Sequence, residues 1–108
     1  MAKQSHAADE KAVKAAIGVY NASRKAYNAS LKALLLALGR LYHGYRTSAN
    51  IDQESAGALV NPRIPQVEVS NIENGNPNDR ITRDQVTALG KALGVKGNFA
   101  GLYGELWA

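Results

Sequence analysis

The chain contains no cysteine, and among its 108 residues there is one Trp and one Phe. Without cysteine, the protein can form neither disulfide bonds nor thiolate metal sites, a composition typical of intracellular proteins. It also lacks an apolar run of the roughly 18 residues that a membrane-spanning helix requires, and its first residues lack the apolar core of a signal peptide. We therefore expect one cytoplasmic domain that does not associate with membranes.

Residues that could carry out catalysis are scarce as well. His6 and His43 are the two histidines, and they lie far apart in the sequence. The chain has no Gly-rich phosphate loop, no pair of metal ligands at a known spacing, and no nucleophile next to an obvious base. The sequence thus predicts a protein without enzymatic activity, cofactor or metal.

Charge is distributed unevenly along the chain. Residues 1–46 carry eight Lys and Arg against Asp9 and Glu10, a net charge of +6, whereas residues 47–108 carry five against seven acidic residues, a net charge of −2. Because cations supply most of the non-specific affinity for nucleic acid, such attraction would come largely from the N-terminal half. The alternative interpretation is that these side chains only solvate an exposed helix.

Residues 8–48 contain almost no helix breakers and are rich in Ala, Leu and Lys, which predicts one long helix or two helices in series. Within this segment apolar residues recur at spacings of three, four or seven and form a stripe along one helix face. This stripe either packs on its own domain or pairs with a second copy, and the small size of the domain favours the dimer. The stripe comprises Val13, Ile17, Tyr20, Tyr27, Leu31, Leu34 and Leu38.

Three shorter helices are predicted after residue 50, in addition to the helix Pro65–Asn74. Asp52 is suited to cap a helix that runs from Gln53 to about Val60. Thr82, followed three residues later by Gln85, forms a capping box for a helix that ends at Gly94. The aromatic tail from residue 98 predicts a last short helix, which either seals the core or forms an interface.

The helix Pro65–Asn74 has an apolar inner face and a polar outer face. Pro65 suits the first turn, Val69 and Ile72 point inward, and Gly75 provides a left-handed stop. The outward side chains include Gln and Asn, whose amides match the donor and acceptor that adenine presents in the major groove. We therefore expect this helix to meet the edges of DNA bases.

Four features in order resemble the lambda-repressor-like helix-turn-helix family (Cro/CI, xenobiotic-response-element type). They are Arg46, Asp52-Gln53, Ile72-Glu73-Asn74-Gly75 and the segment Leu89–Val95. The resemblance covers residues 38–95 and implies an all-α, five-helix domain over residues 31–108, with an extended basic N-terminal helix over residues 1–30. The turn before the recognition helix is two residues longer than in the family, and Asn61 could adopt the left-handed conformation there.

The resemblance also implies roles for individual residues. Gln66 occupies the place of the base-reading glutamine, with Val67 against a thymine methyl group and Asn71 at a further base edge. Arg46 and Glu73 match an internal salt bridge, whereas phosphates would repel Glu68, which we expect to point sideways into solvent. Contacts to DNA phosphates are expected from Gln53, Arg63, Ser70, Arg80 and Arg83.

Taken together, these features predict a sequence-specific transcriptional regulator that binds double-stranded DNA. We expect a homodimeric repressor of phage or mobile-element type, which occupies a palindromic operator. A second interpretation is a protein-interaction module on the same scaffold, such as an antitoxin or a phage inhibitor of a host system. The near-neutral charge after residue 46 and the aromatic tail favour this alternative.

Overall fold

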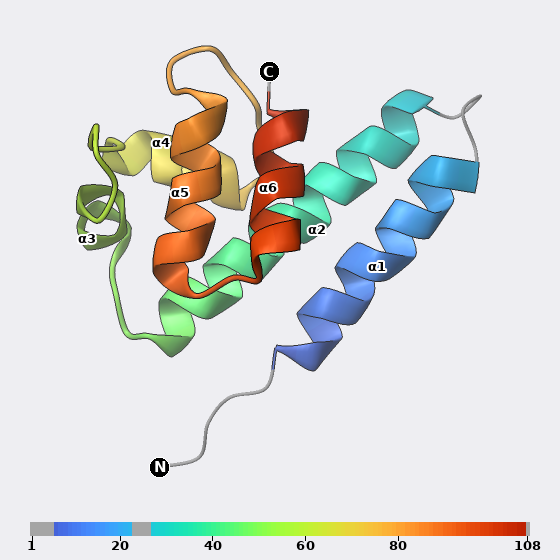
Figure 1. Ribbon diagram of the computed structural model, residues 1–108, viewed down its shortest axis with the longest axis horizontal. Helices are drawn as coiled ribbons and strands as arrows, with labels where there is room; N and C mark the ends of the chain where they lie inside the picture. The colour runs from blue at the N-terminus through green and yellow to red at the C-terminus, as the bar shows by residue number, and fades with distance from the viewer. Residues whose placement is uncertain (1–5, 23–26, 108) are drawn as a thin grey trace.

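The computed structural model describes residues 6–22 and 27–107, and this part of the chain is all-α, as predicted (Figure 1). None of the described helices is long and apolar enough to cross a membrane. The described residues form α1 (Ala7–Ala22), α2 (Tyr27–Ser48), α3 (Gln53–Ala58), α4 (Gln66–Glu73), α5 (Arg83–Leu93) and α6 (Gly97–Leu106).

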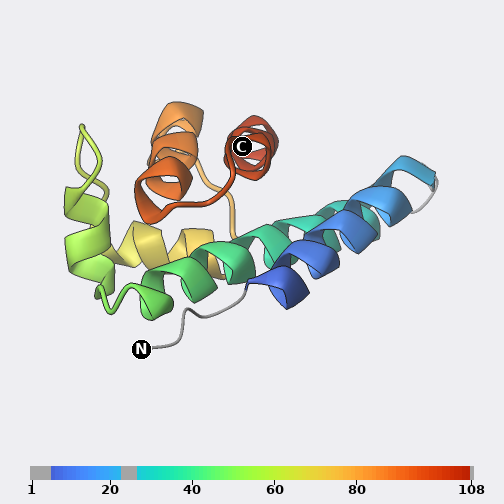
Figure 2. The same cartoon turned by 60° about the horizontal axis from the view of Figure 1, so that its bottom comes forward.

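The predicted long helical segment forms two helices that lie antiparallel and side by side (Figures 1 and 2). Val13 of α1 and Leu34 and Leu38 of α2 are buried, and Ile17 and Leu31 pack against the same core. The apolar stripe thus packs within the chain, although the side chain of Tyr27 lies outside the described ones. The boundary predicted after residue 30 falls inside α2, so one continuous helix joins the two predicted parts.

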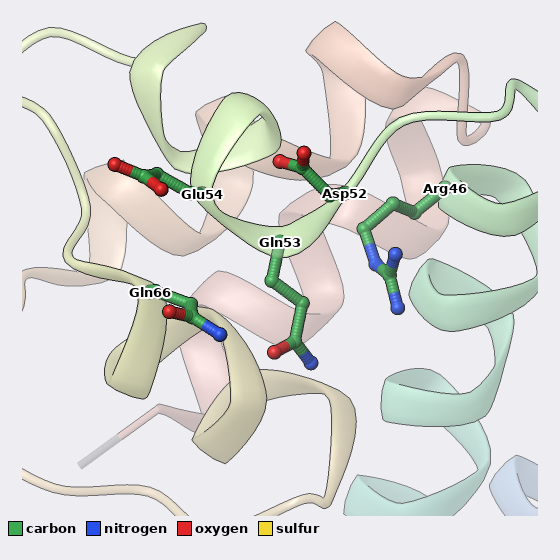
Figure 3. Close-up of a pocket in the computed structure, with 5 residues that line it drawn as sticks. All are labelled: Arg46, Asp52, Gln53, Glu54 and Gln66. Carbon is green, nitrogen blue, oxygen red and sulfur yellow. The ribbon is translucent and has the colours of Figure 1, made fainter.

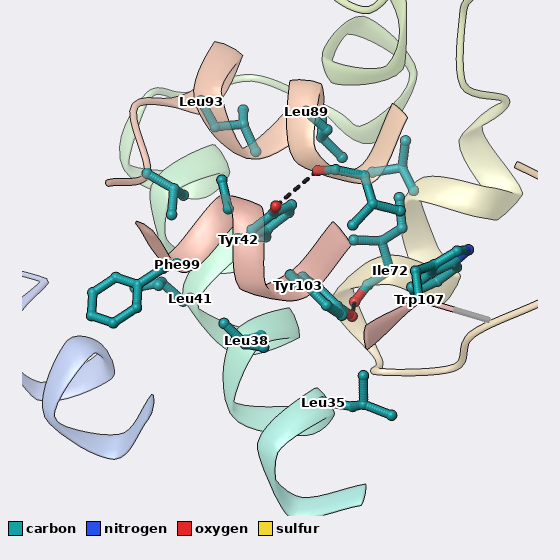
Figure 4. Close-up of a cluster of buried hydrophobic side chains, with 14 of the residues drawn as sticks. Leu35, Leu38, Leu41, Tyr42, Ile72, Leu89, Leu93, Phe99, Tyr103 and Trp107 are labelled. Atoms are coloured by element: carbon teal, nitrogen blue, oxygen red, sulfur yellow. Dashed lines mark hydrogen bonds between the residues drawn. The ribbon is translucent and has the colours of Figure 1, made fainter. Parts of the chain in front are cut away.

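The remaining four helices form a compact unit on the C-terminal half of α2, and their apolar side chains make the main core (Figure 4). Two buried tyrosines connect the helices: the Tyr42 hydroxyl donates to the Val86 carbonyl at 2.8 Å, and the Tyr103 hydroxyl donates to the Ile72 carbonyl. Burial raises the pKa of both phenols, so they stay protonated as donors. Trp107 is fully buried, so the aromatic tail seals the core.

Helix boundaries follow the predicted local signals closely. The Asp52 carboxylate accepts from the backbone N–H of Ser55 at 2.7 Å, and Thr82 and Gln85 form the reciprocal capping box. Gly75 and Gly94 have φ values of 68° and 95°, as left-handed stops require. Two details differ: α3 ends at Ala58 rather than about residue 60, and Pro65 is the residue before α4.

The turn between α3 and α4 folds back onto its neighbours. Ile64 is fully buried beneath it, and a Cβ atom on Gly57 would collide with the Ile64 carbonyl, so this position requires glycine. Gln85 of α5 donates to the Pro62 carbonyl at 2.9 Å. The prediction for Asn61 is wrong, because Asn50 is the non-glycine residue with a positive φ in the described chain. Hydrogen bonds to Gly57 of α3 and to the Gln85 side chain of α5 hold this turn without a left-handed residue.

Candidate nucleic-acid interface

Helix α4 divides into a buried and an exposed side, as its sequence predicts. Val69 and Ile72 are completely buried, whereas Gln66 is exposed and Val67 has 64% of its surface exposed. Ser70, one turn further, is half-buried. The first turn of α4 therefore presents an amide and an apolar side chain at the surface.

Glu73, at the end of α4, forms hydrogen bonds with three side chains from two other helices. Arg46 of α2 donates its Nε to Oε2 at 2.5 Å, Gln53 of α3 donates to Oε1 at 3.1 Å, and His43 Nδ1 lies 3.0 Å from Oε1. Burial alone would raise the pKa of Glu73, but these hydrogen bonds outweigh it and lower the pKa. The salt bridge predicted between Arg46 and Glu73 is present and fixes α4 against α2 and α3.

Glu68, in the first half of α4, is the centre of a second cluster. Its side chain is only 5% exposed, and it accepts from Arg80 Nε at 2.5 Å, Asn78 at 2.9 Å and Asn71 at 3.0 Å. Desolvation would raise the pKa of this carboxyl, yet the three hydrogen bonds lower it. The expectation that Glu68 points into solvent is wrong, because the loop after α4 supplies donors that compensate its burial.

The starts of α3 and α4 face a common depression in the surface (Figure 3). The amide of Gln53 lies between Gln66 and the guanidinium of Arg46, so these three donors share one face. Two carboxylates, from Asp52 and Glu54, line the same depression, which is therefore polar and carries both signs of charge.

The other predicted contact residues lie in different surroundings. Arg63 forms an exposed ion pair with Glu54 at 3.2 Å, beside the depression, and Arg80 keeps 60% of its side chain exposed while it pairs with Glu68. The side-chain amide of Asn71 already donates one hydrogen bond to Glu68. Arg83 lies apart from the depression, at the start of α5, where its Nε donates to the Trp107 carbonyl at 2.8 Å.

A second depression adjoins the first and contains residues to which the sequence gave no role. Its lining comes from the middle of α2, the start of α3 and the end of α4, and Gln53 belongs to both depressions. The exposed positions of α2 repeat every three or four residues, and this spacing is the signal that could have found them. The lining residues are Leu36, Arg40, His43, Gln53, Glu73 and Asn74.

Comparison of the chain with protein-family models, with curated proteins and with solved structures finds no match. Within residues 6–22 and 27–107 there is no cluster of His, Asp and Glu that could hold a metal ion.

Proposed function

We propose that the protein is a sequence-specific, DNA-binding transcriptional regulator of the lambda-repressor-like helix-turn-helix class, with α3 and α4 as its helix pair. The observation that carries the proposal is the shared depression, where Gln53 and Gln66 project from the starts of two consecutive helices onto one face (Figure 3). A helix held at such a face can enter the major groove with its first turn toward the bases.

In this proposal the first turn of α4 reads the sequence. Gln66 is exposed and its amide can bind adenine through both the donor and the acceptor, which discriminates by about 1–3 kcal/mol against a wrong base. Val67 beside it can contact a thymine methyl group. Asn71 contributes less than its residue type suggests, because Glu68 already accepts from its amide.

Several side chains around α4 would contact the DNA backbone. Gln53 and Ser70 lie next to the reading residues, and Arg80 leaves part of its guanidinium exposed. Arg63 can exchange its exposed partner Glu54 for a phosphate, since a solvent-exposed ion pair contributes little stability. The hydrogen bonds from Arg46 and Gln53 to Glu73 fix the position of α4 relative to α2 and α3.

The assembly proposed for this activity is a cytoplasmic homodimer. Two copies related by a two-fold axis would read half-sites about 10–10.5 bp apart, or a multiple of that distance, in a palindromic operator. Occupation of a promoter would repress transcription without any chemical step.

The test is a selection from a random duplex-DNA library, followed by sequencing. We expect an enriched palindrome with the unaltered protein, and loss of the preferred base at one position of each half-site with Gln66→Ala. Asn98→Ala serves as the control, because it removes an exposed polar side chain from α6, away from this face. A folded protein that enriches no sequence would contradict the proposal.

A second candidate function is binding to another protein through the same face. Val67, next to Gln66 at the start of α4, is 64% exposed, and the carboxylates of Asp52 and Glu54 line the same depression as Gln66. Apolar side chains beside acidic groups suit a protein partner, such as a toxin or a host factor. Salt separates the two functions, since DNA binding weakens steeply with ionic strength and an apolar interface does not.

A further inference from the structure

The candidate reading face does not end at α4 but continues onto α2. The two depressions described above share Gln53, and the second is lined from α2 by Leu36, Arg40 and His43. Figure 3 shows Gln53 in the space between α4 and α2. Any DNA that contacts Gln53 and Gln66 thus lies close to the middle of α2.

The side of α2 that meets this surface is positively charged. Lys32, Leu36, Arg40 and His43 follow one another at helical spacing and are all exposed; we call these four residues the α2 stripe. Residues 11–51 contain no Asp or Glu, so α2 has no acidic residue of its own. Within the described part of the chain, neither Lys32 nor Arg40 forms an ion pair, whereas Arg46 on the same helix is bound to Glu73.

We propose that the α2 stripe binds the phosphate backbone of duplex DNA beside the base pairs that α4 reads. Lys32 and Arg40 are eight residues apart, or about 12 Å along the helix, so they can contact different phosphates. These contacts are independent of sequence and add affinity without changing the preferred bases. The inference rests on the proposed function, because it needs α4 to bring the DNA to this face.

A second copy of the chain fits the stripe less well than DNA does. Two copies that met here around a two-fold axis would bring the Lys32 and Arg40 side chains together, and like charges oppose such contact. Leu36 is the only apolar member of the stripe and is just 38% exposed. The stripe is therefore suited to a polyanion and lacks the apolar core of a stable dimer interface.

The test measures the salt dependence of binding by fluorescence anisotropy, with two labelled probes. One is the duplex enriched in the selection, and the other is the unselected duplex pool. The variants are the double substitution Lys32→Gln/Arg40→Gln, the single Arg40→Gln, and Arg40→Lys, which keeps the charge. Lys91→Gln is the matched control, since it removes one exposed cation from α5. Circular dichroism verifies that each variant is folded.

The logarithm of the association constant falls linearly with the logarithm of the salt concentration, and each lost phosphate contact makes this slope shallower by about 0.9. We expect the slope of the double variant to be shallower by about 1.8. If both proteins have equal affinity at 1 M salt, the double variant then binds about 30-fold more weakly than the unaltered protein at 0.15 M, for both probes alike. The slope of Arg40→Gln should be shallower by about 0.9, which is half of the change in the double variant. Arg40→Lys and Lys91→Gln should have the slope of the unaltered protein.

The remaining outcomes overturn the inference in distinguishable ways. If the unaltered protein prefers the enriched duplex and the double variant has the same slope, the proposed function stands and the α2 stripe has no part in it. If the double variant loses only its preference between probes, the stripe reads sequence and does not bind the backbone. If the unaltered protein binds neither probe, the proposed function fails and the inference fails with it.

Discussion

The helical pair α1–α2 and the compact unit α3–α6 use charge in opposite ways. From residue 11 to residue 51 the chain has no carboxylate, and Lys32 and Arg40 are exposed to solvent. In the compact unit two glutamates are buried in α4, and each is paired with an arginine. Buried pairs fix geometry, whereas exposed cations leave charge for a partner. Arg46, which extends from α2 to Glu73, joins the two regions.

The largest effect is expected where this junction is broken. Arg46→Ala would leave the buried carboxylate of Glu73 without its main partner and should lower the free energy of unfolding by about 3–5 kcal/mol. Arg40→Ala, six residues earlier on the same helix, removes an exposed cation. It should change the free energy of unfolding by less than about 0.5 kcal/mol. Urea denaturation followed by circular dichroism measures both. If both variants lost the same free energy of unfolding, burial would not explain a difference between the two arginines.

Two helical glycines extend the comparison to packing. A Cβ atom on Gly39 of α2 would lie 2.6 Å from the Glu73 carbonyl oxygen, whereas a Cβ atom on Gly18 of α1 would meet nothing within 4 Å. Gly39→Ala should therefore destabilise the protein by about 2 kcal/mol through overpacking. Gly18→Ala should stabilise it by up to about 1 kcal/mol, because alanine favours the helix.

Thermal melting of these two variants gives the measurement, and the sign of the shift is decisive. A higher melting temperature for Gly39→Ala would mean that α2 and α4 do not approach each other closely. A lower one for Gly18→Ala would mean that the outer side of α1 is covered.

Local signals in the sequence account for much of the fold. Asp52 and the pair Thr82/Gln85 specify helix starts with partners three residues away, so their caps could be predicted without knowledge of the tertiary structure. The salt bridge of Arg46 and Glu73 was predicted only through the family resemblance, because these residues are far apart in the chain.

Other features depended on packing that no local pattern reveals. The partners of Glu68 include Asn78 and Arg80, ten and twelve residues further on, so its position on α4 alone suggested exposure. Gly39 has no local signature either, since a helical glycine that permits close approach resembles one in open solvent. The same segment of Ala, Leu and Lys is compatible with one helix or two, and the antiparallel packing of α1 on α2 decided between them.

Acid should weaken the compact unit through its buried glutamates. Hydrogen bonds hold the pKa of Glu73 below its ordinary value, so its contribution to stability is complete above the unfolded pKa of about 4.3. This contribution is lost as the pH falls from there through the folded pKa. The urea midpoint, followed by the fluorescence of buried Trp107, should decrease over that range.

The variant Glu73→Gln isolates this effect, because glutamine has no carboxyl group to protonate. We expect its urea midpoint to depend less on pH than that of the unaltered protein, although Glu68, whose pKa is also lowered, still contributes. Parallel curves for the two proteins would contradict the assignment of the acid sensitivity to Glu73.

The smallest effect on stability is expected at the exposed pair of Glu54 and Arg63. Both side chains are more than half exposed, so Glu54→Gln should change the free energy of unfolding by no more than about 0.5 kcal/mol. Its effect on binding should be larger, since it removes a negative charge from the candidate interface and frees Arg63 for a phosphate. Duplex affinity at low salt should therefore rise, with a salt slope steeper by about 0.9. A protein partner that Arg63 and Glu54 contact together would instead bind less tightly, so this one exposed carboxylate distinguishes the two candidate functions.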